Sequence, residues 1–114
     1  MRIVRDHITL GELQELADDR FGDMVKAVID LDRELMAVGE GMHADEEAGL
    51  LDDGSRQTAL WGINLYPGDH GTADWIEFDS MINLRPAQDN RTTSVDDPNV
   101  RERIAAIVDR LVLA

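Results

Sequence analysis

The chain contains no cysteine and very little positive charge. Across its 114 residues, ten arginines and a single lysine, Lys26, stand against 24 acidic residues, and aromatic residues make up 4%. The absence of cysteine excludes disulfides, thiolate metal sites and cysteine nucleophiles, and it leaves the redox compartment open. The scarcity of basic residues argues against binding of nucleic acid or an anionic membrane through a broad surface.

Long apolar segments are also absent. No part of the chain approaches the roughly 18 uncharged apolar residues of a membrane-spanning helix, and the N-terminal residues lack the apolar core of a signal peptide. We therefore expect a soluble, cytoplasmic protein without membrane association. The length fits one domain, and a 43% apolar content with interleaved acids indicates a folded globule rather than a disordered acidic chain.

What the sequence does have is evenly distributed acidic charge. The net charge is −13, and successive thirds of the chain carry nine, eight and seven acids. An even spread predicts a wholly acidic surface, whose self-repulsion is relieved by salt because the Debye length falls to about 3 Å near 1 M. This composition is typical of salt-accumulating halophiles, and we interpret the chain as a haloarchaeal cytoplasmic protein.

Two helices have clear sequence signals. The first is predicted over Leu10–Phe21, where Thr9 and Glu12 match a capping box. The last begins with Asp97 as N-cap and Pro98 at the first helical position. Its apolar positions follow the spacing of a core-facing helix: Val100, Ile104, Ile107, Val108 and Leu111.

The middle of the chain offers weaker signals. A short helix is predicted over Asp45–Leu51 with Asp45 as its N-cap. The segment Met24–Val38 fits either a helix or a hairpin that turns near Asp32 and Arg33. Its β-branched content favours strands, although the turn lacks an Asn-Gly or Asp-Gly pair.

The remaining strands are predicted from alternation of apolar and polar residues. They cover Arg2–Arg5, Leu60–Tyr66 and Trp75–Arg85, and the last two are expected to form a hairpin. A polar loop follows over Pro86–Asp97. The prediction is a single α+β domain, ordered β-α-β-β-α-β-β-α, in which the first and last helices cover one face of a mostly antiparallel sheet.

Three stretches of the chain carry a family resemblance. They are Arg20–Lys26, His43–Pro67, and Ile76–Pro86 with Asn90 and Arg91. Together they resemble a family of small uncharacterised bacterial and archaeal proteins that is described as a domain of unknown function. The likeness covers nearly the whole chain. It implies an independent α+β domain, and it carries no reaction, substrate or residue role.

The best candidate for a binding site is the local group of Asn83, Arg85, Asn90 and Arg91. Guanidinium and amide groups recognise carboxylate or phosphate, and this group lies in a chain that has little positive charge. Asn64 would project from the neighbouring strand on the same face. The alternative is that the arginines neutralise nearby acids and hold a long loop by bonding its carbonyl groups.

A second candidate site combines His43, Asp45 and Asp79. Imidazole and carboxylate groups suit divalent metals and proton transfer. The spacing around His43 matches neither a zinc protease motif nor an EF-hand loop, and a capped acidic helical turn explains the same residues. The sequence also lacks a Gly-x-Ser-x-Gly elbow and a phosphate-binding glycine loop.

We therefore favour a non-enzymatic binding module for a small anionic ligand or a protein partner, without a metal or cofactor. The alternative is a small hydrolase or metal-dependent enzyme that uses His43, Asp45 and Asp79. A third possibility is a subunit of a larger assembly. A pocket that joined His43 to Asp79 would favour the enzyme, whereas a flat apolar patch would favour the subunit.

The charge distribution predicts that salt stabilises the fold. Screening of a net charge of −13 weakens repulsion between neighbouring carboxylates, so the midpoint of thermal unfolding is expected to rise between low salt and ~1 M KCl. Circular dichroism at a series of KCl concentrations measures this midpoint. A midpoint that is flat or falls with salt would contradict the halophile interpretation.

Overall fold

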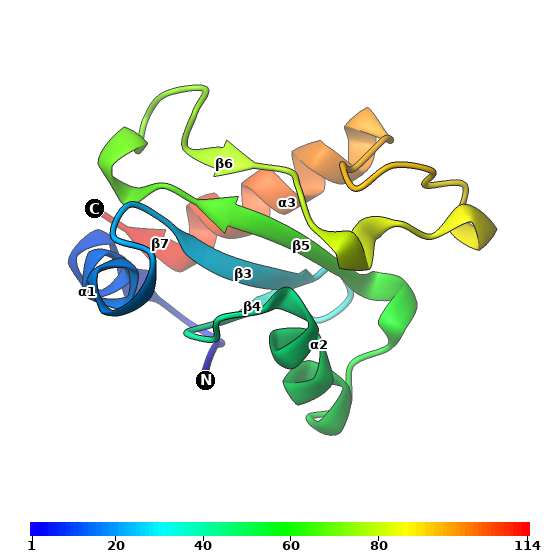
Figure 1. The fold of residues 1–114 in the computed structure, drawn as a ribbon, viewed down its shortest axis with the longest axis horizontal. Helices are drawn as coiled ribbons and strands as arrows, with labels where there is room; N and C mark the ends of the chain where they lie inside the picture. The colour runs from blue at the N-terminus through cyan, green and yellow to red at the C-terminus, as the bar shows by residue number, and fades with distance from the viewer.

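A five-stranded antiparallel sheet forms the centre of the computed structural model, which describes residues 1–114 (Figure 1). The strands lie in the order β1-β4-β3-β5-β6. Their bounds are β1 Arg2–Val4, β3 Val25–Asp30, β4 Leu35–Val38, β5 Leu60–Leu65 and β6 Ile76–Glu77. Two further strands, β2 (Ile8–Thr9) and β7 (Val112–Leu113), form a separate parallel pair. The predicted α+β class and mostly antiparallel sheet are confirmed.

Three α-helices accompany the sheet: α1 Leu10–Arg20, α2 His43–Asp52 and α3 Pro98–Leu111. The capping box of α1 is present, since the Thr9 hydroxyl accepts from the Glu12 N–H and the Glu12 carboxylate accepts from the Thr9 N–H. Asp97 caps α3 as predicted, accepting from the Asn99 N–H at 2.8 Å. None of these helices combines the length and the apolar character that crossing a bilayer requires.

The ambiguous segment 24–38 is a hairpin. β3 and β4 pair from Ala27↔Val38 to Asp30↔Leu35. The turn between them is built on Asp30, whose Oδ1 accepts from the N–H groups of Asp32 and Arg33 at 2.8 and 3.0 Å. A buried carboxylate therefore replaces the Asn-Gly signature that short hairpins commonly use.

The sheet is covered on both faces. One face packs against α1 and α3 in a core of 20 buried residues that includes Leu13, Ile63 and Ile104. The other face carries a smaller cluster in which Leu50 of α2 packs against Val28. The first and last helices thus cover one face, as predicted, and α2 covers part of the other. In Figure 1, α1 lies at the left end of the sheet and α2 at the lower right.

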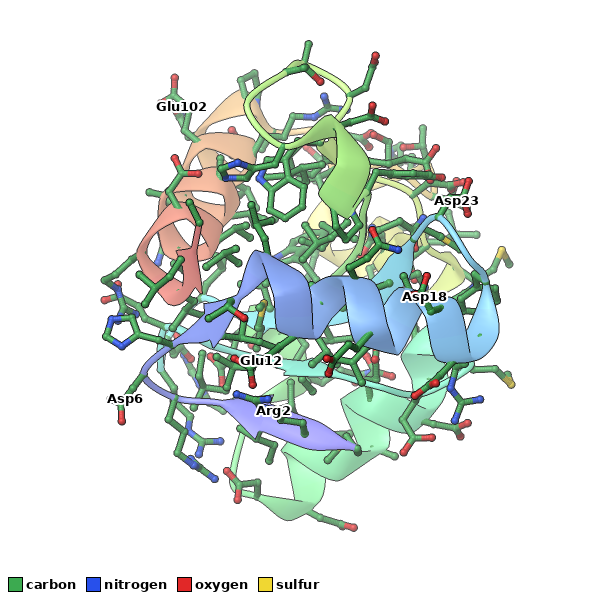
Figure 2. The ribbon with its side chains drawn as sticks, turned by 90° about the vertical axis from the view of Figure 1, so that its left-hand side faces the viewer. Arg2, Asp6, Glu12, Asp18, Asp23 and Glu102 are labelled. Carbon is green, nitrogen blue, oxygen red and sulfur yellow. The ribbon has the colours of Figure 1, made fainter.

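Almost all of the acidic residues lie outside the core. Of the 24 acids, only Asp30 and Glu46 are buried. Figure 2 shows Asp6, Asp23 and Glu102 near the outline of the molecule and Asp18 on the side of α1 that faces the viewer, while Glu12 of α1 turns back to pair with Arg2 of β1. That pair spans 2.6 Å between Arg2 Nη1 and Glu12 Oε2.

The strand predicted over Trp75–Arg85 is much shorter in the structure. Only Ile76 and Glu77 pair with β5, and the chain then turns into a 3₁₀ helix, η3 (Met81–Asn83). The turn passes so close to β5 that a Cβ on Gly62 would lie 2.5 Å from the Cβ of Ser80. Alternation of residue types persists through the turn, so the sequence pattern predicted a continuous strand.

Side chains replace the missing strand along the edge of β5. The Asn83 amide accepts from the Gly62 N–H at 2.8 Å and donates to the Gly62 carbonyl at 2.9 Å. Two residues nearer the start of β5, the Leu60 carbonyl accepts a hydrogen bond from Arg85. The backbone polar groups of β5 are therefore satisfied first by β6, then by Asn83 and then by Arg85, as buried peptide groups require.

Replacement of Asn83 by Ala is expected to destabilise the domain by roughly 3–5 kcal/mol, because it leaves the buried N–H and C=O of Gly62 without partners. Asn99→Ala, at an exposed position of α3, is the matched control and should change stability little. Urea unfolding measures both variants. Equal stability of Asn83→Ala and Asn99→Ala would show that the amide pairing is dispensable.

Candidate functional site

A pocket of about 540 Å³ opens beside the N-terminus of α2. Its wall is formed by β3, β5, β6 and the segment that leads into η3, and we call it the α2 pocket. Its polar lining residues are Lys26, His43, Asn64, Glu77, Asp79, Ser80 and Thr93. Its apolar lining residues are Met24, Met42, Ala44, Met81 and Ile82.

Sheet register places three of the polar side chains in one row. Lys26 of β3 lies opposite Asn64 of β5, and Asn64 lies opposite Glu77 of β6. Directly opposed residues share a face of the sheet, with strands about 4.8 Å apart. The row therefore runs from a cationic side chain through an amide to a carboxylate.

Asn64 is buried and only partly satisfied. Its Nδ2 donates to Glu77 Oε1 at 2.7 Å and to the Asp79 carbonyl at 3.2 Å. Both partners are acceptors, so the NH₂ group must face them, and the amide oxygen must face the other way. That oxygen, Oδ1, is buried and has no hydrogen-bond donor. The residue as a whole is only 6% exposed.

His43 supplies a second acceptor. Its Nε2 lies 2.8 Å from the Ile63 carbonyl, which can only accept, so Nε2 carries the proton and Nδ1 carries a lone pair in the neutral ring. Burial lowers the pKa of His43 below its ordinary value, and the charge of Lys26 adds to this effect. Together they outweigh the Ile63 hydrogen bond, the charge of Asp79 and the Asn64 side chain, which can accept from the charged ring and raises the pKa. The ring is therefore neutral at pH 7.

The N-terminus of α2 opens onto the same pocket without a side-chain cap. The N-cap residue is Met42, so the prediction of Asp45 as N-cap is wrong. The first N–H groups of a helix have no carbonyl acceptor within the helix. The Met42 side chain accepts no hydrogen bond from the N–H groups of the first turn, which begins with His43 and Ala44. The positive end of the helix dipole is left facing the pocket.

The acidic first turn of α2 carries less charge than its sequence indicates. Glu46 is fully buried, and burial raises its pKa to about 9, so this carboxyl is protonated at neutral pH. Its Oε2 accepts from the Glu40 N–H at 3.3 Å, and its Oε1 has no partner. Asp45 is exposed and does not line the pocket.

The predicted anion-binding group is held largely by internal hydrogen bonds. Both Asn83 and Asn90 are buried, and Asn90 Nδ2 donates to the carbonyls of Asn83, Thr92 and Ser94 at 2.7–3.1 Å. Arg85 donates to the carbonyls of Gln57, Leu60 and Ile82. Arg91 is exposed and lies 3.5 Å from Asp89. No cavity of the structure is lined by more than one of the five predicted residues.

Of the second candidate group, His43, Asp45 and Asp79, two residues lie in the same pocket. The α2 pocket brings His43 and Asp79 together with Asn64, and it leaves out Asp45. No three His, Asp or Glu side chains of the structure are grouped so that they could hold a metal ion.

Sequence reasoning did not place Lys26 and Glu77 in the site. The strand register, which aligns both with Asn64, was the signal that could have found them.

Comparison with known proteins identifies a family. Residues 2–111 match the family described as "Protein of unknown function (DUF5674)". The chain belongs to this family. No curated protein and no solved structure matches the chain. Membership in DUF5674 thus confirms the resemblance to a domain of unknown function and assigns no activity to the α2 pocket.

The protonation state and the tautomer of His43 can be measured by ¹⁵N NMR of the imidazole. We expect the neutral ring with the proton on Nε2 at pH 7, and a titration midpoint below 6.5. Since the folded-state pKa is lowered, the stability that His43 contributes is present above pH 6.5 and is lost as the pH falls. A proton on Nδ1 at pH 7, or a midpoint above 6.5, would contradict the assigned tautomer and environment.

Proposed function

We propose that this domain is a binding module that holds a small polar ligand in the α2 pocket. The observation that carries the proposal is the unpartnered Oδ1 of Asn64, a buried acceptor in the pocket wall. A buried acceptor without a donor costs about 1–3 kcal/mol. A ligand that donates a hydrogen bond would recover that cost, and the lone pair of His43 Nδ1 offers a second acceptor in the same pocket.

The size and rim of the pocket support the same proposal. A volume of about 540 Å³ is within the range of small-molecule sites. Met42 and Met81 are 58% and 75% exposed at its edge. Methionine side chains are flexible and polarizable, so this rim can adapt to the apolar part of a ligand.

An anionic ligand at residues 83–91, as proposed from the sequence, is supported by one exposed guanidinium, that of Arg91. A protein partner would draw on exposed apolar side chains near the pocket, namely Met42, Met81 and Leu84. The α2 pocket is favoured over both because its polar wall includes a buried group that lacks a partner.

An acid–base enzyme is the second candidate function. It is favoured by the pocket that His43 shares with Asp79, since a neutral imidazole with a free Nδ1 can accept a proton from a bound water or substrate. Turnover of a bound compound that requires His43 would support this function over simple binding.

A halophilic, cytoplasmic setting remains part of the proposal. It is supported by the 22 of 24 acids that are not buried. A high cytoplasmic salt concentration would screen their mutual repulsion.

A fragment screen tests the binding function. Small N–H and O–H donors are added to ¹⁵N-labelled protein, and we expect hits to shift the signals of His43, Ser80 and the Asn64 side-chain amide together. Ala44→Trp places a large side chain at the exposed edge of the pocket and should block these shifts.

Arg91→Ala, at an exposed position outside the pocket, is the matched control and should leave them unchanged. A screen in which no donor shifts the pocket signals, or in which Ala44→Trp binds as well as the parent protein, would refute the proposed function.

A further inference from the structure

We infer that the ligand of the α2 pocket carries an uncharged primary carboxamide group. This inference rests on the proposed binding function and adds the chemical class of the ligand. It follows from unfilled acceptors, free donors and positive charge that lie together in one part of the pocket.

Two acceptors without donors lie close together in the wall of the pocket. The NH₂ group of Asn64 is held by Glu77 and the Asp79 carbonyl, so Oδ1 faces away from Glu77 and has no donor. The Asn64 side chain lies close enough to His43 to accept from its charged ring, but the neutral ring has a lone pair at Nδ1 instead of a proton. An NH₂ group of a ligand has two N–H donors and can supply one to each acceptor.

The same acceptors lie near positive charge. Lys26 is opposite Asn64 across the pairing of β3 and β5, on the side that Oδ1 faces. Its Nζ lies 5.5 Å from the centre of the Phe21 ring, so we expect Lys26 to act on the acceptors through its charge. Burial is the main cause of the lowered pKa of His43, and the charge of Lys26 lowers it further by more than the charge of Asp79 raises it. A cationic donor is therefore disfavoured at this position, and an uncharged donor is favoured.

Free N–H groups lie beside these acceptors. The N-terminus of α2 has no side-chain cap, and its first two N–H groups belong to His43 and Ala44. His43 therefore contributes a free N–H group from its backbone and a free acceptor from its ring. Because a donor and an acceptor occur within one residue, the group that binds there must itself carry an acceptor and a donor close together.

A primary carboxamide meets these requirements. Its NH₂ group donates two hydrogen bonds, its carbonyl oxygen accepts, and it has no net charge. A carboxylate lacks the donors. An amidinium group lacks the acceptor and would add positive charge on the Lys26 side of Asn64. The exposed Met42 and Met81 side chains at the rim can contact the apolar remainder of the ligand.

Four probes of nearly equal shape separate these requirements. They are hexanamide, hexanoate, the hexanamidinium cation and 2-heptanone, which differ only in the groups at their planar end. Each is titrated into the full chain at pH 7 and constant ionic strength, with ¹⁵N NMR as the readout. Hexanamide is expected to bind more tightly than each of the others, by roughly 5- to 100-fold, because each analogue leaves a donor or an acceptor of the protein without a partner.

Substitutions of Lys26 test the role of positive charge. Lys26→Met removes the charge, so the preference for hexanamide over hexanamidinium should fall by roughly 3- to 10-fold. Lys26→Arg keeps the charge and should keep the preference. Arg91→Ala, at an exposed position outside the pocket, should change none of the four affinities.

The possible outcomes separate this inference from the function on which it rests. If hexanamidinium, hexanoate or 2-heptanone binds as tightly as hexanamide, the carboxamide inference is overturned while a ligand pocket remains. The same holds if Lys26→Met and the parent protein prefer hexanamide over hexanamidinium equally. If none of the four probes moves the His43 and Asn64 signals, yet fragments do, the ligand class alone is wrong. If neither probes nor fragments move them, the binding function fails as well.

Discussion

The pairing of the Asn83 amide with the backbone of Gly62 is the interaction on which the rest of the structure depends. β5 is buried along its whole length, yet β6 pairs with only its last two residues. Where β6 ends, the buried edge of β5 would have N–H and C=O groups without partners. Asn83 supplies one donor and one acceptor to this edge, at 2.9 and 2.8 Å. Its second N–H donates to the Thr93 carbonyl and so ties the following loop to the sheet. A two-residue strand is sufficient only because a side chain continues its hydrogen bonding.

The same constraint creates the pocket. The chain leaves β6 early and turns over Gly62. This turn places three residues on the α2 face of the sheet instead of along its edge: Asp79, Ser80 and Met81. There they meet the uncapped N-terminus of α2. Gly62 is required for this approach, because a Cβ at that position would lie 2.5 Å from Ser80 Oγ. Asn64, two residues further along β5, then becomes part of the pocket wall, with its amide nitrogen held by Glu77 and its oxygen unpartnered.

Local signals made much of the fold predictable, and long-range contacts account for the rest. The helices α1 and α3 were predicted because their caps lie within a few residues of the apolar stripes they introduce. Two features could not be predicted from local signals. The length of β6 depends on how closely Ser80 approaches Gly62. The N-cap of α2 is Met42, whose side chain makes no capping hydrogen bond. For the site, His43 and Asp79 were singled out in one group and Asn64 in another. The register of β3, β5 and β6 aligns Asn64 with Lys26 and Glu77, and the α2 pocket brings all five residues together.

The central claim is that the free Oδ1 of Asn64 is an unfilled position for a hydrogen-bond donor of a ligand. A crystal structure of the protein soaked in an N–H donor fragment that shifts the pocket signals tests it most directly. The account predicts a donor nitrogen of the fragment within about 3 Å of Asn64 Oδ1. A structure in which the pocket holds no fragment, or in which the fragment makes no contact with Asn64 Oδ1, would contradict it.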